Sequence, residues 1–156
     1  MINAPILQHL PNVYSYSDTL ITSGQPAAED FQLINDAGCQ LVINLALPDS
    51  PGAIKNEDTL VRSAGCDYLH IPVDFKAPNK NNLEAFFTAM DANRDKSKLV
   101  HCAYNWRVSA FVFLYRVIKC NTATDEAMAD LRNIWIPDSI WQTFISEMLA
   151  DQLPGL

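Results

Sequence analysis

The sequence predicts a three-layer α/β/α domain built on a mostly parallel sheet of four to five strands. Apolar stretches of strand length alternate along the chain with longer segments of helical periodicity, which is typical of parallel sheets covered on both faces. The segment QLVINL at 40–45 is almost continuously apolar, as expected for a strand buried on both faces. The chain has 156 residues, a common size for one domain, so we expect a single domain over 1–156.

Turn residues mark the elements of the first half of the chain. The expected elements are strands at 13–16, 19–22 and 40–45 and helices at 27–37 and 54–64. Pro26, in the turn SGQP, stands at a plausible first position of a helix. Gly38 and Gly65 each follow the expected end of a helix, where glycine is the preferred stop.

The second half is richer in helix. The expected elements are strands at 67–73 and 97–102 and helices at 79–93, 107–119, 124–134 and 139–149. Leu83, Phe86, Phe87 and Met90 recur at intervals of three and four, which defines the apolar face of the first of these helices. Ligands in such folds gather at the carboxyl ends of the strands, so residues just after each strand are the candidates for a site.

The charge pattern excludes two classes of binding protein. The net charge is −7 and no cluster of Lys or Arg stands out, whereas nucleic-acid binding requires a basic face. The same balance argues against adhesion to an anionic membrane. The N-terminus lacks a secretion signal, and no apolar run approaches the roughly 18 residues of a transmembrane helix. The sequence leaves the oligomeric state open.

The cysteine pattern favours a cytoplasmic protein with reduced thiols. Cys39, Cys66, Cys102 and Cys120 are widely spaced and form no CxxC pair. This spacing argues against a zinc site and against a disulfide framework. We therefore expect no structural metal.

The segment KLVHCAYNWRVSAFVFLYR carries the clearest chemical signal. In this segment Cys102 follows the end of an expected strand, and a buried helix is expected to begin near Arg107. Free amide groups at a helix N-terminus bind anions and favour the thiolate form of a cysteine held there, as does a neighbouring arginine. A lone cysteine beside apolar residues is more often a core residue, but this combination favours an anion-binding loop. Its expected anion-binding residues are Ala103, Tyr104, Asn105, Trp106, Arg107 and Val108.

The loop resembles the phosphate-binding loop of the cysteine-dependent protein phosphatases, in which HC is followed by five residues, Arg, and Ser or Thr. Upstream, LITSGQPAAEDFQLINDAGCQLVINL resembles the opening of bacterial phosphatase-like domains that are fused to metallo-β-lactamase-like hydrolases in some proteins. DYLHIPVDFKAPN resembles the region of the acid loop in dual-specificity phosphatases. The resemblance spans roughly residues 13–150 and implies a protein-tyrosine-phosphatase-like fold.

The loop departs from the phosphatase pattern in its spacing. Four residues separate Cys102 from Arg107, and Val108 occupies the usual arginine position. Asn105 replaces the usual glycine, and asparagine tolerates left-handed backbone angles better than most residues. Two geometries are open: a tighter loop with Arg107 turned inward, or a loop of full length with Arg107 displaced outward.

The resemblance implies a role for each candidate residue. The Cys102 thiolate would attack phosphorus to form a phosphocysteine, while Arg107 and the loop amides bind the phosphoryl oxygens. Asp74, 28 residues before the cysteine, would protonate the leaving oxygen. Ser109 would hydrogen-bond the sulfur, and His101 would orient the loop through backbone contacts. The partner would be a phosphorylated protein or small molecule, with no cofactor.

Nearby residues are assigned simpler roles. His70 is expected to be packed or hydrogen-bonded, and Trp135 and Trp141 to contribute packing. Gln25 and Asn44 stand at strand ends from which they can approach the site.

Two alternatives to a phosphatase remain open at this level. The four-residue spacing resembles the rhodanese sulfurtransferases, whose smaller loop accommodates a persulfide. The lost glycine and the shifted arginine are also compatible with a catalytically weak or inactive anion-binding module.

Overall fold

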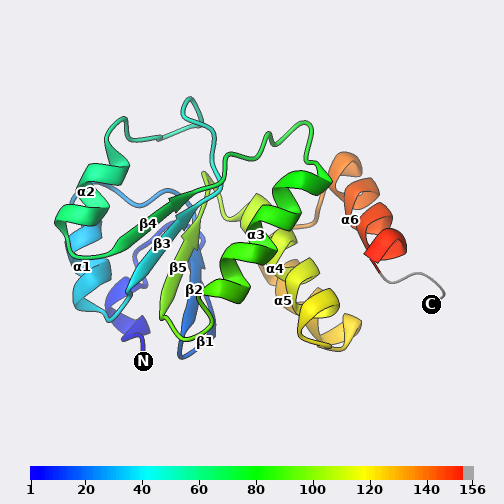
Figure 1. Cartoon of the computed structure of the whole chain (residues 1–156), viewed down its shortest axis with the longest axis horizontal. Helices are drawn as coiled ribbons and strands as arrows, with labels where there is room; N and C mark the ends of the chain where they lie inside the picture. Colours follow the sequence, from blue (N-terminus) through cyan, green and yellow to red (C-terminus); the bar gives the residue numbers. More distant parts are fainter. Residues whose placement is uncertain (153–156) are drawn as a thin grey trace.

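Five strands form the central layer of the computed structural model, which describes residues 1–152 (Figure 1). The strand order is β1-β2-β5-β3-β4. Strand β1 runs antiparallel to β2, and every other neighbouring pair is parallel. The three-layer α/β class with a mostly parallel sheet of four to five strands is therefore confirmed.

The elements follow the expected order. The strands are β1 (Tyr14–Ser17), β2 (Leu20–Ser23), β3 (Leu41–Asn44), β4 (Asp67–His70) and β5 (Lys98–His101). The helices are the 3₁₀ helix η1 (Ala4–Leu7), α1 (Asp30–Asp36), α2 (Glu57–Ser63), α3 (Lys80–Ala92), α4 (Trp106–Lys119), α5 (Thr124–Ile134) and α6 (Ser139–Gln152).

Two hydrophobic cores lie on opposite faces of the sheet. Helices α1 and α2 cover one face and α3 to α6 lie on the other (Figure 1). Along β3, Leu41 and Ile43 pack into the core beneath α3 and α4, whereas Val42 packs toward α1 and α2. Because side chains of a strand alternate between faces, a strand between two cores must be apolar at every position. This explains the apolar run at 40–45.

Four boundaries differ from the prediction by three residues. Helix α2 is one of them, since it begins at Glu57 rather than at residue 54. Strand β4 ends at His70 rather than at residue 73, because its pairing with β3 becomes irregular there: the Ile71 and Val73 amides donate to the adjacent carbonyls of Asn44 and Leu45, whereas a regular ladder uses carbonyls two residues apart. Helix α1 begins at Asp30 rather than at 27, since residues 27–29 form a turn closed by the Asp30 carboxylate, which accepts from the Ala27 amide. Helix α6 continues to Gln152.

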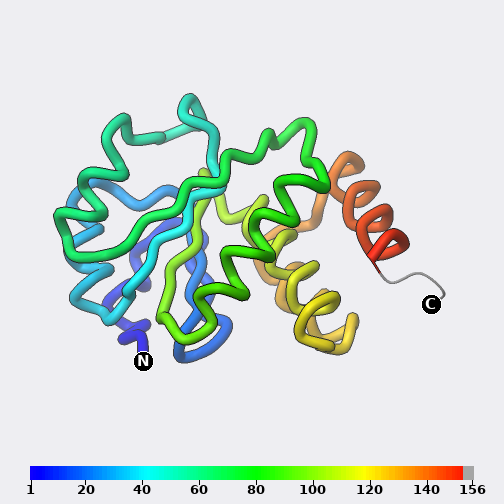
Figure 2. The backbone as a smooth tube through the Cα atoms, in the orientation of Figure 1, coloured from blue at the N-terminus to red at the C-terminus, as the bar shows by residue number. Residues whose placement is uncertain are grey.

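The loops after β3, β4 and β5 leave the carboxyl edge of the parallel strands. Figure 2 shows the chain after β3, near residues 47–55, and the chain after β4, near residues 71–79, leaving the same edge. Residues from all three loops line one cavity, described below. The fold thus gathers its candidate residues at the edge where ligands of parallel sheets bind.

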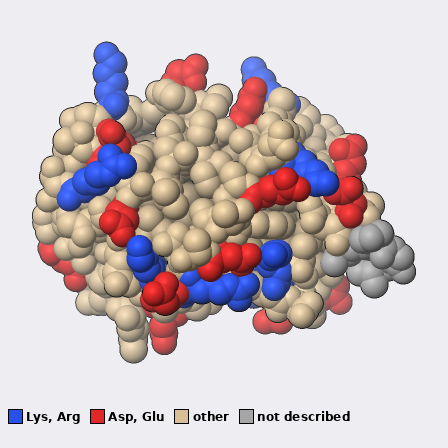
Figure 3. Space-filling model, viewed as in Figure 1, with Lys and Arg blue, Asp and Glu red and all other residues tan. Residues whose placement is uncertain are grey.

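Charged side chains are dispersed over the face drawn in Figure 3, where basic and acidic groups alternate. Lys96 lies 3.0 Å from Asp67, and Lys80 lies 2.7 Å from Asp151. Such partly exposed pairs contribute little stability each. No helix within residues 1–152 has the length and apolar character needed to span a membrane.

Candidate active site

A short loop joins β5 to α4 and is held from both sides. This cysteine loop (residues 102–105) ends at Asn105, whose φ of 68° and ψ of 6° are left-handed, as asparagine allows. The side chain of Asn105 is buried, and its Nδ2 donates to the Asn12 carbonyl at 2.7 Å and to the Thr22 hydroxyl at 2.9 Å. Asparagine therefore sets the turn and anchors it to the neighbouring strand.

The SGQP turn packs directly against the cysteine loop. The Gln25 amide donates to the Ala103 carbonyl at 3.0 Å. A Cβ added at Gly24 would lie 2.6 Å from that carbonyl oxygen and 3.1 Å from the Pro11 Cβ. Only glycine fits this close approach, so the turn after β2 is part of the support of the loop.

Several backbone amides around the cysteine have no hydrogen-bond acceptor in the described part of the chain. The first three amides of α4, at residues 106–108, have no partner within the helix. Neither they nor the amides of residues 103 and 104 donate to another group within residues 1–152. With the positive end of the helix dipole, these amides favour an anion beside Cys102.

A cavity of about 520 Å³ opens over the loop. This cysteine cleft is lined by residues 102–104, 106 and 107 of the loop and α4, by residues 47 and 49–51 after β3, and by residues 74–76 after β4. Cys102 is 1% exposed and lines the cleft. A ligand therefore meets the cysteine only inside this cavity.

Arg107 is turned inward. It is 5% exposed and lines the cysteine cleft. Its Nη1 donates to the Val73 carbonyl at 2.8 Å and its Nη2 to the Ser50 hydroxyl at 3.4 Å. The guanidinium carbon also lies 6.0 Å from the centre of the Phe75 ring. The four-residue spacing thus leaves the guanidinium in the same cavity as the cysteine.

Two carboxylates line the cleft. Asp74 is exposed, and its Oδ1 accepts from the Lys76 amide at 2.9 Å, which fixes the turn after β4. Asp49, in the loop after β3, also lines the cavity. The sequence analysis did not single out Asp49, because an aspartate between prolines is an ordinary turn residue.

Aromatic side chains support one wall of the cleft and engage Ser109. The Ser109 hydroxyl donates to the Trp106 carbonyl at 2.8 Å and accepts from the Trp135 indole at 2.9 Å. Trp106 and Trp135 stack with ring centres 5.1 Å apart, and Trp141 donates to the Phe75 carbonyl at 2.9 Å. A bond from Ser109 to the cysteine sulfur would require its hydroxyl to turn away from Trp106.

Behind the loop, His101 is fully buried against a carboxylate. Its Nε2 lies 2.7 Å from Glu57 Oε2, and its Nδ1 lies 3.2 Å from the Cys102 carbonyl. Burial raises the pKa of Glu57, but hydrogen bonds from His101 and Gln25 and the charge of His101 outweigh it and hold this pKa below its ordinary value. The sequence analysis missed Glu57, which looks like any acidic residue opening a helix.

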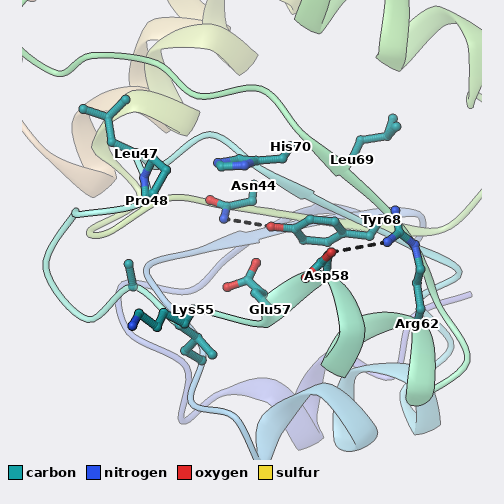
Figure 4. A pocket seen from close by; sticks show the side chains of 12 residues that line it. Asn44, Leu47, Pro48, Lys55, Glu57, Asp58, Arg62, Tyr68, Leu69 and His70 are labelled. Carbon is teal, nitrogen blue, oxygen red and sulfur yellow. Dashed lines mark hydrogen bonds and ion pairs between the residues drawn. The ribbon is translucent and has the colours of Figure 1, made fainter.

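A second cavity of about 420 Å³ lies on the other side of Glu57, between α2 and β4 (Figure 4). Asn44 lines it and donates to the Tyr68 hydroxyl at 3.1 Å, so this side chain does not line the cysteine cleft. His70 lies 2.6 Å from the Ala46 carbonyl, which confirms its hydrogen-bonded role. Gln25, in contrast, does reach the support of the cysteine loop.

The sequence matches the model of a phosphatase family. Residues 14–141 match the family model described as "DSP-PTPase phosphatase fused to NAD+ Kinase". The chain belongs to this family. Comparison with curated proteins gives no match. The resemblance to dual-specificity and cysteine-dependent tyrosine phosphatases is thus confirmed.

Solved structures support the same family. A putative phosphatase (DUF442) from Shewanella putrefaciens CN-32 is 35% identical, with 96% of this chain and 98% of that chain covered and a TM-score of 0.85. P. aeruginosa TpbA, solved in complex with pTyr, is 17% identical, with 92% and 91% covered and a TM-score of 0.69. Kinase associated phosphatase (KAP) is 14% identical, with 88% and 89% covered and a TM-score of 0.75. The last two show a shared fold.

Proposed function

We propose that this family member hydrolyses a phosphomonoester through a phosphocysteine intermediate on Cys102. The observation that carries the proposal is the cysteine cleft, in which a cysteine, an inward arginine and uncommitted amides share one cavity. An anion with several oxygens is the ligand that such a donor set stabilises. Phosphoryl transfer needs mainly positioning and charge stabilisation, and these groups supply both.

The chemistry proceeds in two balanced steps. The Cys102 thiolate attacks phosphorus, and the bond to the leaving oxygen breaks while Asp74 gives that oxygen its proton. Water then attacks the phosphocysteine, Asp74 takes a proton from it, and the sulfur–phosphorus bond breaks to release inorganic phosphate. Arg107 and the loop amides bind the equatorial oxygens in both steps. Ser109 would stabilise the departing thiolate once its hydroxyl has turned.

The aromatic wall favours a substrate with a flat leaving group. Tyr104 is 45% exposed, lines the cleft and lies 5.1 Å from the Trp106 ring. Phe75 adds a third ring 5.9 Å from Trp106. Such a wall stacks on aryl groups, and an aryl phosphate is therefore the first substrate to test.

Hydrolysis of 4-nitrophenyl phosphate by the wild type and by Cys102→Ser tests the proposal. We expect turnover that vanadate inhibits and that the serine variant loses. Phosphate-dependent thermal stabilisation in a wild type without turnover would instead indicate an inactive anion-binding module, because phosphate would still bind the native state preferentially.

The four-residue spacing between Cys102 and Arg107 supports a second candidate, a sulfurtransferase. In that reaction the thiolate takes the outer sulfur of thiosulfate, sulfite leaves, and cyanide accepts the sulfur from the persulfide as thiocyanate. Cyanide-dependent thiocyanate formation without hydrolysis of aryl phosphate would favour this candidate over the phosphatase.

A further inference from the structure

A buried carboxylate outside the cysteine cleft is linked to the back of the cysteine loop. Glu57, the first residue of α2, is 3% exposed, and in Figure 4 its carboxylate lies beneath Asn44 and Tyr68. Its Oε2 lies 2.7 Å from His101 Nε2, and its Oε1 accepts from Gln25 Nε2 at 2.7 Å. Helix α2 contributes no residue to the lining of the cleft, so Glu57 does not meet a ligand there.

Both routes from Glu57 lead to successive carbonyl groups of the loop. His101 Nδ1 contacts the Cys102 carbonyl at 3.2 Å, and the backbone amide of Gln25 donates to the Ala103 carbonyl at 3.0 Å. In a planar trans peptide the carbonyl and the next amide point in opposite directions. Holding these two carbonyls behind the loop therefore turns the amides of Ala103 and Tyr104 away from Glu57, toward the side where the cleft lies.

The same contacts fix the orientation of the His101 ring. An ionised carboxylate and a carbonyl can only accept, and each faces one of the two ring nitrogens. The lowered pKa of Glu57 keeps the carboxylate ionised and so supports this arrangement.

We propose that Glu57 is a positioning residue of the cysteine loop, which it holds through His101 and Gln25 in the form that presents free amides beside the Cys102 sulfur. The inference rests on the proposed use of this loop as the phosphate site. It also explains why α2, remote from the cleft, begins with a buried acid.

The test compares Glu57→Gln, which keeps the shape and removes the charge, with Asp58→Asn as the matched control. Asp58 is exposed on the same turn, and within residues 1–152 its ion pair is with Arg62, at 3.6 Å. The readouts are kcat on an aryl phosphate, the rate of iodoacetamide alkylation of Cys102 at pH 7, and phosphate-dependent thermal stabilisation. Alkylation of the exposed Cys120 serves as the internal reference.

We expect Glu57→Gln to lower kcat and the Cys102 alkylation rate by about ten- to a hundredfold, with Cys120 unchanged and Asp58→Asn like the wild type. In a His101→Asn background, Glu57→Gln should lower kcat and the Cys102 alkylation rate much less, because Glu57 acts through His101. If Glu57→Gln does not fold, Gln25→Met removes one of the two links and should show a smaller loss of the same kind.

Three results would overturn the inference: wild-type alkylation and kcat in Glu57→Gln, equal losses with and without His101, or a wild-type Cys102 no more reactive than Cys120. Failure of the proposed function is distinguished from these by its own readout. A wild type that hydrolyses no phosphate ester but has a fast-reacting Cys102 would refute the phosphatase, and alkylation would still decide the role of Glu57.

Discussion

Replacing Gly24 by alanine tests whether the SGQP turn positions the cysteine loop. The new Cβ would lie 2.6 Å from the Ala103 carbonyl oxygen, whereas ordinary contact begins at 3.4 Å, so the two groups must separate by about 0.8 Å. The Pro11 Cβ, at 3.1 Å, limits retreat to the other side. The loop carbonyl must therefore move, and a displacement approaching 1 Å at a reacting group lowers the rate by about a hundredfold.

Gly65→Ala is the matched control for this prediction. Gly65 has a φ of +101° and packs against Asn35, far from the cysteine loop in the chain and absent from the cleft lining. Both variants should lose about 1–3 kcal/mol of the free energy of unfolding, since each forces strain into a packed position. Only Gly24→Ala should lower kcat on an aryl phosphate and weaken phosphate-dependent stabilisation. Equal kcat values for the two variants would refute the support we assign to Gly24.

Further predictions concern the charged groups. Asp74→Asn should slow the hydrolysis of phenyl phosphate by about a hundredfold or more and that of 4-nitrophenyl phosphate far less, because a good leaving group needs no acid. If Asp49→Asn shows this difference instead, the general acid is Asp49. Arg107→Lys should lower kcat/KM by about a hundred- to a thousandfold, because lysine lacks the planar fork, and a near-normal value would argue against bidentate binding. Because the pKa of Glu57 is lowered in the folded state, the ionised side chain stabilises the fold at pH values above the unfolded-state pKa of about 4.3. This stabilisation is lost as the pH falls through the folded-state pKa. In urea unfolding between pH 6 and pH 3.5, the difference in the free energy of unfolding between wild type and Glu57→Gln should therefore decrease toward acid pH. A difference that stays constant would contradict this.

The fold could be predicted because its signals are local. The apolar run of β3 and the helical periodicity of α3 each depend on burial of a few neighbouring residues, and every expected element exists. The boundaries that failed depended on single hydrogen-bonding groups. The Val73 amide donates to the Leu45 carbonyl, out of register with β3, and the Asp30 carboxylate closes a turn in place of the first turn of α1.

The site could be predicted from the segment at 101–109 and, through the family resemblance, for Asp74, which lines the same cavity. The order of Cys102, Asn105 and Arg107 along the chain indicated an anion loop, but no spacing rule gives the direction of the arginine side chain. That direction depends on Val73 and Ser50, which come from two other loops.

The missed residues belong to contacts between distant segments. Glu57 lies 44 residues before His101, and Trp135 lies 26 residues after Ser109. Nothing in the sequence around either residue indicates which partner it contacts. Only the packing of α2 and α5 against the rest of the fold reveals what they hold.

The most direct test of the central claim is to trap the intermediate on the cysteine. Wild-type protein is mixed with excess 4-nitrophenyl phosphate, quenched within one turnover and digested, and the peptide that contains Cys102 is analysed by mass spectrometry. We expect one added phosphoryl group on Cys102, absent from Cys102→Ser. Turnover of the ester by the serine variant, or a phosphoryl group on another residue with Cys102 unmodified, would contradict the account.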